Sequence, residues 1–207
     1  ETMSGFTTTG ATILDDVECF PHGLLFWRSL TQWIGGLGIV FFTIALLPSL
    51  VGGQTKVFAA DATGPMKTKL HPRLSTSAKW IWSTYLVLTI ACILSYYVAG
   101  MGLFDSFNYA MTTTATGGFS THNTSTEFFH SPSLEYICTF FCFLSGVNFT
   151  LLYAAVIKFK IKELFRNSEF RFYIFLVTVF SIFIMVELMV MRNYDVEHAF
   201  RSAIFQV

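Results

Sequence analysis

The chain has 207 residues, of which 53% are hydrophobic and 13% are charged, and its formal net charge at pH 7 is zero. Soluble domains carry about 25% charged residues, so about half of the charge expected on a water-exposed surface is missing. The composition therefore excludes an ordinary soluble domain, and the neutral balance points to neither a nucleic-acid nor an acidic partner. It predicts a protein that is largely surrounded by lipid.

Four apolar stretches are long enough to cross a bilayer as helices. Three of them, residues 29–55, 80–101 and 136–157, contain no Asp, Glu, Lys or Arg, and the fourth, 172–191, contains only Glu187. Each reaches the roughly 20 residues that a helix needs to span a hydrocarbon core of about 30 Å. An ionisable group within a span is a candidate for an ion or proton role, but Glu187 lies near the outer end of its stretch, where an interfacial position is the alternative.

The distribution of basic residues predicts how these spans are oriented. Of the 13 Lys and Arg, five lie in residues 52–79 and five in residues 158–171, whereas residues 102–135 contain none. By the positive-inside rule, the two basic loops are cytoplasmic and the loop 102–135 faces the outside. The sequence therefore predicts a multi-pass protein of the plasma membrane, which is the inner membrane of a bacterium.

Two Thr/Gly-rich segments recur on the predicted outer side, TTTGAT at residues 7–12 and TTTATGGFS at residues 112–120. Gly10 and Gly117 each precede the next predicted span by the same number of residues. The second segment follows a predicted short helix, residues 104–114, which is too brief to cross a bilayer. Irregular backbone at membrane depth is tolerated only inside protein or against a water-filled cavity, so the pattern predicts re-entrant loops.

A third copy of this unit begins near the C-terminus, where Phe200 and Ala203 repeat the F-x-x-A spacing of Phe107 and Ala110. Because the chain opens with Glu1 and the third copy stops before a Thr/Gly segment, we expect a piece of a longer polypeptide. Residues 1–50 are predicted to contain the end of a first pore helix, its filter and the following transmembrane helix, and residues 51–79 a cytoplasmic loop. Residues 80–157 are predicted to form a complete helix–pore loop–helix repeat, and residues 158–171 a second cytoplasmic loop. Residues 172–207 are predicted to contain the outer helix of a third repeat and the start of its pore helix.

The Thr/Gly loops suit the chemistry of a potassium filter, which replaces the hydration shell of the ion with backbone carbonyl oxygens from several re-entrant loops. Glycine accepts positive φ, and a short helix before each loop directs its partially negative C-terminal end at the cation. A Thr/Gly-rich extracellular turn is the alternative for either loop alone, but two such loops on one membrane face favour the filter. The predicted fold is an all-α membrane protein of repeated helix–re-entrant pore loop–helix units, like those of potassium channels, with about four transmembrane spans and short pore helices.

Three motifs resemble those of a known family, the Trk/Ktr/HKT superfamily of potassium transporters. The segment MSGFTTTGAT at residues 3–12 is similar to the first filter of that family, and QWIGGLGI at residues 32–39 resembles the helix that follows it. The segment ATGGFST at residues 115–121 resembles the second filter. The matching order covers nearly the whole chain, and the resemblance is closest to the bacterial TrkH branch.

The resemblance implies a single pore built from four helix–loop–helix repeats in one polypeptide, with one central glycine in each filter, here Gly10 and Gly117. The K⁺ filter residues that it implies are Thr8, Thr9, Gly10, Ala11, Ala115, Thr116, Gly117 and Gly118. It also implies a homodimer that docks a cytoplasmic, nucleotide-binding regulatory subunit of the TrkA/KtrA type. No cofactor is expected, because K⁺ is the transported ion.

Potassium uptake through this filter is the predicted function. The alternative is a sodium-coupled or poorly selective monovalent cation transporter of the same superfamily; some members carry Ser at the first filter glycine, and Gly10 argues against that alternative. An intramembrane enzyme would need an acid–base or nucleophile–base pair at bilayer depth, where Glu187 is the only ionisable residue within a predicted span. The sequence therefore predicts a transporter and not an enzyme.

Overall fold

The computed structural model describes residues 1–38, 74–148, 151–152, 161–192 and 194–207. Every regular element in these ranges is a helix, which confirms the predicted all-α class for the described part of the chain. Most of the predicted loop 51–79 and most of the predicted span 29–55 lie outside the described residues.

The first unit contains two helices joined by an extended loop. The short helix α1 (Thr2–Phe6) ends directly before the first Thr/Gly segment, and α2 (His22–Gly36) returns after it. α2 begins after Pro21, whose φ of −63° and ψ of 144° place it in the extended conformation that precedes a helix. Shortly after α2 ends, the backbone reaches a φ of 70° at Gly38, a conformation that glycine adopts without steric cost.

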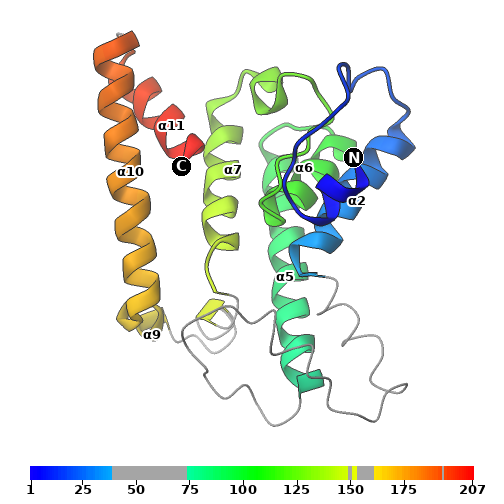
Figure 1. Ribbon diagram of the computed structural model, residues 1–207, viewed down its shortest axis with the longest axis horizontal. Coiled ribbons are helices and arrows are strands. Elements are labelled where there is room, and N and C mark those ends of the chain that lie inside the picture. Colours follow the sequence, from blue (N-terminus) through cyan, green and yellow to red (C-terminus); the bar gives the residue numbers. More distant parts are fainter. Residues whose placement is uncertain (39–73, 149–150, 153–160, 193) are drawn as a thin grey trace.

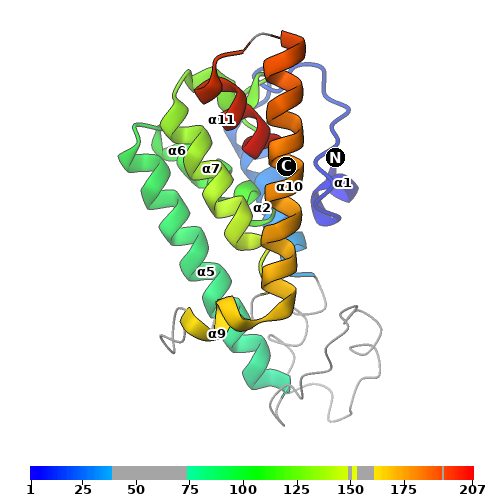
Figure 2. The same cartoon turned by 90° about the vertical axis from the view of Figure 1, so that its left-hand side faces the viewer.

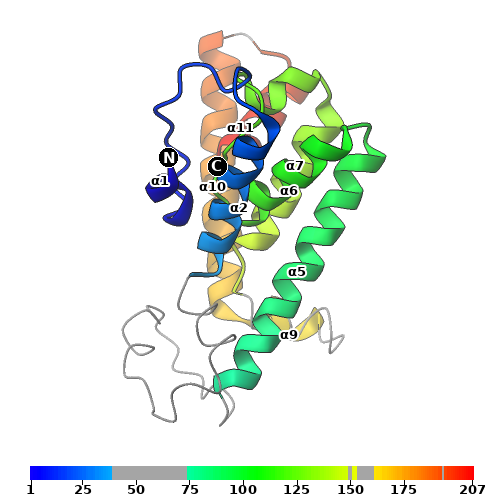
Figure 3. The same cartoon turned by 90° about the vertical axis from the view of Figure 1, so that its right-hand side faces the viewer.

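The second unit is a complete helix–loop–helix repeat. α5 (Leu74–Val98) ends where Gly100, with a φ of 100°, turns the chain into α6 (Leu103–Thr114). The 12 residues of α6 extend over about 18 Å, which is too short to cross a bilayer. After the second Thr/Gly loop, the chain passes through the 3-10 helix η1 (Ser125–Phe129) and enters α7 (Pro132–Ser145). The end of α5 and the start of α7 both lie in the upper part of the molecule (Figures 1 and 3), as a re-entrant loop requires.

The predicted span 136–157 is not one continuous helix, because α7 ends at Ser145. The next residue is Gly146, and the hydroxyl oxygen of Tyr173 lies 2.6 Å from the place where a Cβ on this glycine would be. Glycine is a poor helix former, and here it also allows close contact with a neighbouring helix. The Asn148 carbonyl then accepts the first hydrogen bonds of a new turn.

Two further helices, α9 (Ile161–Arg166) and α10 (Ser168–Arg192), follow. The Asn167 side chain accepts hydrogen bonds of 2.8 and 3.3 Å from two N–H groups in the first turn of α10 and so caps this helix. Within the described residues, α10 and the part of α5 from Trp80 to Val98 are the two helices that are long and apolar enough to cross a membrane. Glu187 is exposed on α10.

The last helix, α11 (Val196–Gln206), repeats the F-x-x-A pattern of α6 in three dimensions. Ala110 and Ala203 are both fully buried, whereas Phe107 and Phe200 are both exposed. Small residues allow helices in membranes to approach closely, and each alanine faces the neighbours of its short helix. α11 contacts α7 and α10, at the end of α10 that lies opposite α9 (Figure 2).

The centre of the described structure is α6, which lies between α2, α5 and α7 (Figures 1 and 3). Tyr96 of α5 packs edge-to-face on Tyr109 of α6, with 6.4 Å between ring centroids. Trp33 of α2 stacks on Tyr85 of α5, and its ring N–H donates a 3.0 Å hydrogen bond to Thr89 Oγ1. The helices around α6 are therefore joined to one another, and they hold the short helix in place.

Candidate functional site

Both Thr/Gly loops leave their helices through the same hydrogen-bonded turn. The four bonds are Thr8 N–H to Gly5 O (2.9 Å), Thr9 N–H to Ser4 O (3.0 Å), Thr116 N–H to Thr113 O (3.0 Å) and Gly117 N–H to Thr112 O (3.0 Å). This pair of bonds in each loop is the Schellman motif, which ends a helix with one residue in the left-handed conformation. The two loops therefore begin with the same backbone geometry.

The backbone conformation also shows which residues of the two loops are equivalent. φ is 53° at both Thr8 and Thr116, and it is 75° at Gly10 and 80° at Gly118. The structural equivalent of Gly10 is therefore Gly118, one residue after the Gly117 that the sequence pairs with it. The second loop has two adjacent glycines, and only the backbone dihedral angles distinguish between them.

Residues of positive φ alternate with residues that lack it in each loop. Thr9 lies between Thr8 and Gly10, Gly117 lies between Thr116 and Gly118, and neither Thr9 nor Gly117 has positive φ. A cation filter presents several backbone carbonyl oxygens to the ion, and positive φ gives the backbone orientations that regular helices and strands do not have. A residue with a side chain rarely adopts positive φ. Its occurrence at both Thr8 and Thr116 therefore marks a conformation that the two loops share.

The two loops touch at Gly10 and Gly117. The Gly117 carbonyl oxygen occupies the space where a Cβ on Gly10 would lie, and the Gln32 side chain fills the space where a Cβ on Gly117 would lie. Both positions therefore need glycine for close approach. Gly117 is buried, whereas Thr116 and Gly118 on either side of it are exposed.

The other predicted filter residues occupy different environments. Thr9 and Ala11 of the first loop are exposed, and Thr8 is half-buried. Ala115 is buried and is the C-cap of α6, so its backbone equivalent in the first loop is Thr7, the C-cap of α1. The structure thus brings Gly10 and Gly117 together and places Ala115 at the helix end, before the alternating stretch begins.

Hydroxyl groups hold the C-terminal end of α6 behind the second loop. Thr113 Oγ1 lies 2.9 Å from the hydroxyl oxygen of Tyr96, and Thr114 Oγ1 lies 3.2 Å from Thr89 Oγ1. Both partners belong to α5. Because the last carbonyls of a helix carry partial negative charge, this fixed helix end contributes a favourable field for a cation at the loop.

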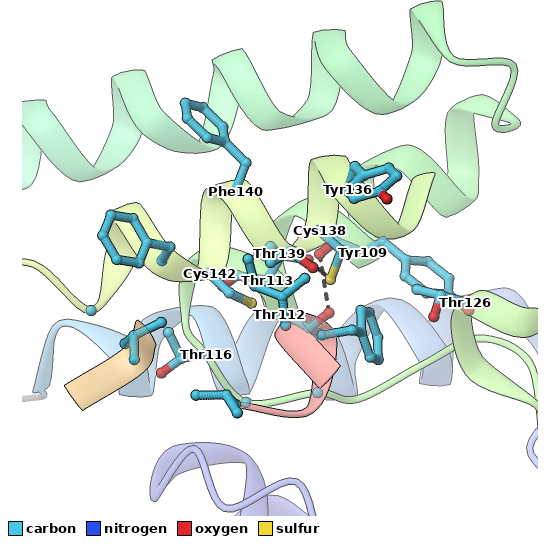
Figure 4. Close-up of a pocket in the computed structure, with 18 of the residues that line it drawn as sticks. Tyr109, Thr112, Thr113, Thr116, Thr126, Tyr136, Cys138, Thr139, Phe140 and Cys142 are labelled. Carbon is cyan, nitrogen blue, oxygen red and sulfur yellow. Dashed lines mark hydrogen bonds between the residues drawn. The ribbon is translucent and has the colours of Figure 1, made fainter. Parts of the chain in front are cut away.

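A cavity of about 850 Å³ lies beside the second loop. Figure 4 shows Thr112 and Thr113 of α6 near Cys138 and Cys142 of α7, with Thr116 of the loop to one side. α10 and the last residues of α11 form further parts of the wall. The residues that the structure describes contain no group of three or more His, Cys, Asp or Glu that could hold a metal. Thr112, Thr113 and Thr116, which carry hydroxyl groups, and Cys138 and Cys142, which carry thiols, are among the polar residues of the wall.

Two buried polar residues of α2 contact the loops, and the sequence pattern did not predict either of them. Arg28 is 4% exposed and Gln32 is 0% exposed. Arg28 Nε donates a 2.8 Å hydrogen bond to the carboxylate of Glu1 in an ion pair, and Gln32 Oε1 accepts a 3.1 Å hydrogen bond from the N–H of Phe119. The sequence feature that could have identified Arg28 is its position at the edge of the apolar stretch 29–55, since a charged residue at membrane depth is a candidate for a functional role.

The linkers of the two units are hydrogen-bonded to each other outside the loops. Asn123 Nδ2 donates to Asp16 Oδ1 at 2.8 Å, and Asn123 Oδ1 accepts from the N–H of Val17 at 2.8 Å. The hydrogen bonds that Asp16 accepts, first from the Cys19 thiol and then from Asn123, hold the pKa of its carboxyl below the ordinary value. Asp16 is therefore charged at neutral pH, and it adds negative charge near the loops.

Replacement of Asn123 by Ala is expected to lower stability by about 1 kcal/mol, because the N–H of Val17 loses its acceptor and Asp16 loses a donor. The melting temperature of the detergent-solubilised protein measures this effect. The neighbouring Thr124→Ala is the control, since Thr124 is exposed. Equal melting temperatures for the two variants would show that the linker bond does not stabilise the pair of units.

The family described as TrkH, cation transport protein, matches residues 1–207. The Trk system potassium uptake protein TrkH of Halomonas elongata is 36% identical over 208 residues, which cover 100% of this chain and 43% of that protein. The Trk system potassium uptake protein TrkH of Escherichia coli K12 is 41% identical over 175 residues, which cover 84% of this chain and 36% of that protein.

The crystal structure of the potassium transporter TrkH from Vibrio parahaemolyticus has the same architecture, with a TM-score of 0.80 and 36% identity. The similarity covers 98% of this chain and 41% of the Vibrio chain. The chain thus spans about two fifths of the length of the relatives that it matches. The family consists of cation transport proteins and not of enzymes. Because the match extends over the entire sequence and over the fold, the chain belongs to the TrkH family of cation transport proteins.

Proposed function

We propose that the full-length protein takes up K⁺ through a filter of backbone carbonyl oxygens. The observation that carries this proposal is the pair of Thr/Gly loops, which share a helix-ending turn and an alternation of φ and which meet at Gly10 and Gly117. The named relatives are potassium uptake proteins, which supports K⁺ as the ion. Because the chain spans about two fifths of their length, the activity is proposed for the longer polypeptide.

The proposed ion ligands are carbonyl oxygens of the two loops. A cation that enters a filter loses its water and needs several oxygen ligands at once, so each loop supplies only part of the coordination shell. The proposed residues are Thr8, Thr9, Gly10 and Ala11 in the first loop, and Ala115, Thr116, Gly117 and Gly118 in the second. Because Gly10 and Gly118 are equivalent in backbone conformation, the residue of the second loop that corresponds to Ala11 is Phe119.

We also propose a membrane orientation and partners for the full-length protein. The filter loops face the outside, and the basic segments 52–79 and 158–171 face the cytoplasm, which agrees with their positive charge. The remaining repeats of the subunit complete the pore, and the subunit forms a homodimer that docks a nucleotide-binding subunit of the TrkA/KtrA type. Lipid covers the apolar surface of α10, where Phe172 and Phe183 are exposed.

Replacement of Gly117 by Asp is expected to abolish growth of a potassium-uptake-deficient strain on limiting K⁺ when the strain carries the full-length protein. The new side chain would overlap with Gln32 and displace the second loop from Gly10. Gly23→Asp is the matched control, because it adds the same charge in open space near the start of α2, and we expect growth like that of the wild type. Undiminished rescue by Gly117→Asp would contradict the filter assignment.

Uptake of Rb⁺ in the presence of competing Na⁺ distinguishes K⁺ uptake from the sodium-coupled or poorly selective alternative. If the filter selects K⁺, an excess of Na⁺ leaves Rb⁺ uptake nearly unchanged, since Rb⁺ replaces K⁺ in such filters. Strong inhibition by Na⁺, or a requirement for Na⁺, would favour the alternative instead.

A further inference from the structure

One face of α2 carries two buried polar side chains, Arg28 and Gln32, that point toward the second loop although α2 belongs to the first unit. They lie four residues apart, which places them on the same side of the helix. Arg28 Nη1 donates a 3.2 Å hydrogen bond to the carbonyl of Ser120, and Gln32 Oε1 accepts a hydrogen bond from the N–H of Phe119. Two consecutive residues after the second filter are therefore held by the helix that follows the first filter.

Arg28 also holds the first loop through Glu1. Their 2.8 Å ion pair is largely shielded from solvent, with 4% of the Arg28 side chain and 18% of the Glu1 side chain exposed. The Glu1 carboxylate further accepts hydrogen bonds from Thr12 Oγ1 at 2.7 Å and from the N–H of Ile13 at 2.8 Å. The pair thus connects the start of the first pore helix with the chain that leaves the first filter.

The Arg28 guanidinium also lies over the Phe119 ring, 4.3 Å from its centroid, in a cation–π contact. A planar guanidinium can stack on a ring while its separate N–H groups bond to acceptors on either side, whereas a lysine ammonium is a single point charge on a flexible chain. Here the Nε and Nη1 groups serve Glu1 and Ser120, which belong to different filter units. The geometry therefore requires arginine and not only a positive charge.

Gln32 fills the space beside the second filter. Its amide group occupies the place where a Cβ on Gly117 would lie. Its amide nitrogen lies 3.8 Å from the place where a Cβ on Gly10 would lie. Within the described residues, this nitrogen is buried without a hydrogen-bond partner. An unpaired buried donor is unfavourable, so the orientation of Gln32 is set by its bond to Phe119 and by contact with the two glycines.

We propose that Arg28 is a positioning residue for ion selectivity, which fixes the separation of the two filter loops through Glu1 on one side and Ser120 and Phe119 on the other. This inference rests on the proposed function. A binding site discriminates between similar ligands only when its groups stay within about 0.5 Å of the required geometry. Without the separate N–H groups of the Arg28 guanidinium, the two loops can move relative to each other, and the filter then accepts Na⁺ as well as K⁺.

The test uses the full-length protein reconstituted in liposomes, with Rb⁺ and Na⁺ uptake measured per molecule of folded protein. Arg28→Lys keeps the positive charge but loses the planar guanidinium that bonds to Glu1 and Ser120 at once. Glu1→Gln keeps the size of the side chain but loses the ion pair. We expect each variant to lower the ratio of Rb⁺ to Na⁺ uptake by about tenfold, the factor that corresponds to about 1.4 kcal/mol. We expect the double variant to lose no more selectivity than the more affected single variant, because both changes break the same connection.

Arg192→Lys is the matched control, since Arg192 is exposed at the end of α10, and its uptake ratio should equal that of the wild type. A ratio unchanged in both Arg28→Lys and Glu1→Gln would overturn the inference, and so would fully additive losses in the double variant. Neither result would affect the proposed function. Absence of Rb⁺ uptake by the wild-type protein would instead overturn the proposed function itself. A purely structural role would lower the amount of folded protein without changing the ratio per molecule, and that outcome also contradicts the inference.

Discussion

Gly10→Ala is expected to reduce Rb⁺ uptake to the background level, without loss of the protein from the membrane. The φ of 75° at this position costs an alanine about 1–2 kcal/mol. The added Cβ also overlaps with the Gly117 carbonyl oxygen, so the two loops must separate. Since the overlap falls on a proposed ion ligand, uptake suffers more than folding does. Tracer uptake in liposomes, normalised to the folded protein, measures the effect.

Two alanine variants separate backbone strain from overlap between the loops. Gly118→Ala faces the same positive φ, 80°, but its Cβ meets nothing within 4 Å, so we expect a partial loss of uptake. Gly23→Ala has neither problem, because it lies in open space near the start of α2, and its uptake should equal that of the wild type. If Gly10→Ala retained as much uptake as Gly118→Ala, contact between the loops would not be required for transport.

Features that depend on apolar length and local pattern could be predicted from the sequence. The short segment 104–114 between two glycine-rich turns predicts a pore helix, and the structure has α6 at Leu103–Thr114. Similarly, the uncharged stretch 80–101 predicts a span, and α5 continues to Val98, shortly before Gly100 reverses the chain. In both cases, glycine and hydrophobic length act locally, so neighbouring residues in the sequence carry the information.

Features that depend on backbone dihedral angles or on contacts between distant residues could not be predicted in this way. The equivalence of Gly10 with Gly118 follows from dihedral angles, because the second loop offers two adjacent glycines that look alike in sequence. The end of α7 at Ser145 depends partly on the Tyr173 hydroxyl, which packs against the next residue from another helix. Likewise, Arg28 gains its role from partners 27 and 92 positions away. No local pattern contains these distances.

The position of α2 explains why the two Thr/Gly loops, the proposed filters, lie side by side. Gly35 of α2 packs against the backbone of Phe6, the last residue of α1. The adjacent Gly36 packs against Ala115, the C-cap of α6, with 2.9 Å between the Ala115 Cα and the place where a Cβ on Gly36 would lie. Because neither glycine has a side chain, one helix can contact the C-terminal ends of both pore helices. The same helix carries Arg28, which contacts both units and which we propose aligns the loops.

Gly35→Ala is therefore expected to destabilise the protein by about 3 kcal/mol, the upper part of the range for overpacked sites. The new Cβ would overlap with the carbonyl group and the Cα of Phe6, and backbone atoms cannot move aside as a flexible side chain can. Displacement of Phe6 also moves the turn that begins the first Thr/Gly loop. The melting temperature in detergent, followed by size-exclusion chromatography after heating, measures the loss, and we expect a decrease of at least about 5 °C.

Gly23→Ala again provides the control, because the same substitution in the same helix meets open space and should leave the melting temperature unchanged or slightly higher. Gly36→Ala should fall between the two, since its neighbours include the Tyr85 hydroxyl, which can shift more easily than backbone. The expected order of melting temperatures is Gly23→Ala, then Gly36→Ala, then Gly35→Ala. If Gly35→Ala melted together with Gly23→Ala, contact between α2 and α1 would not stabilise the first Thr/Gly loop.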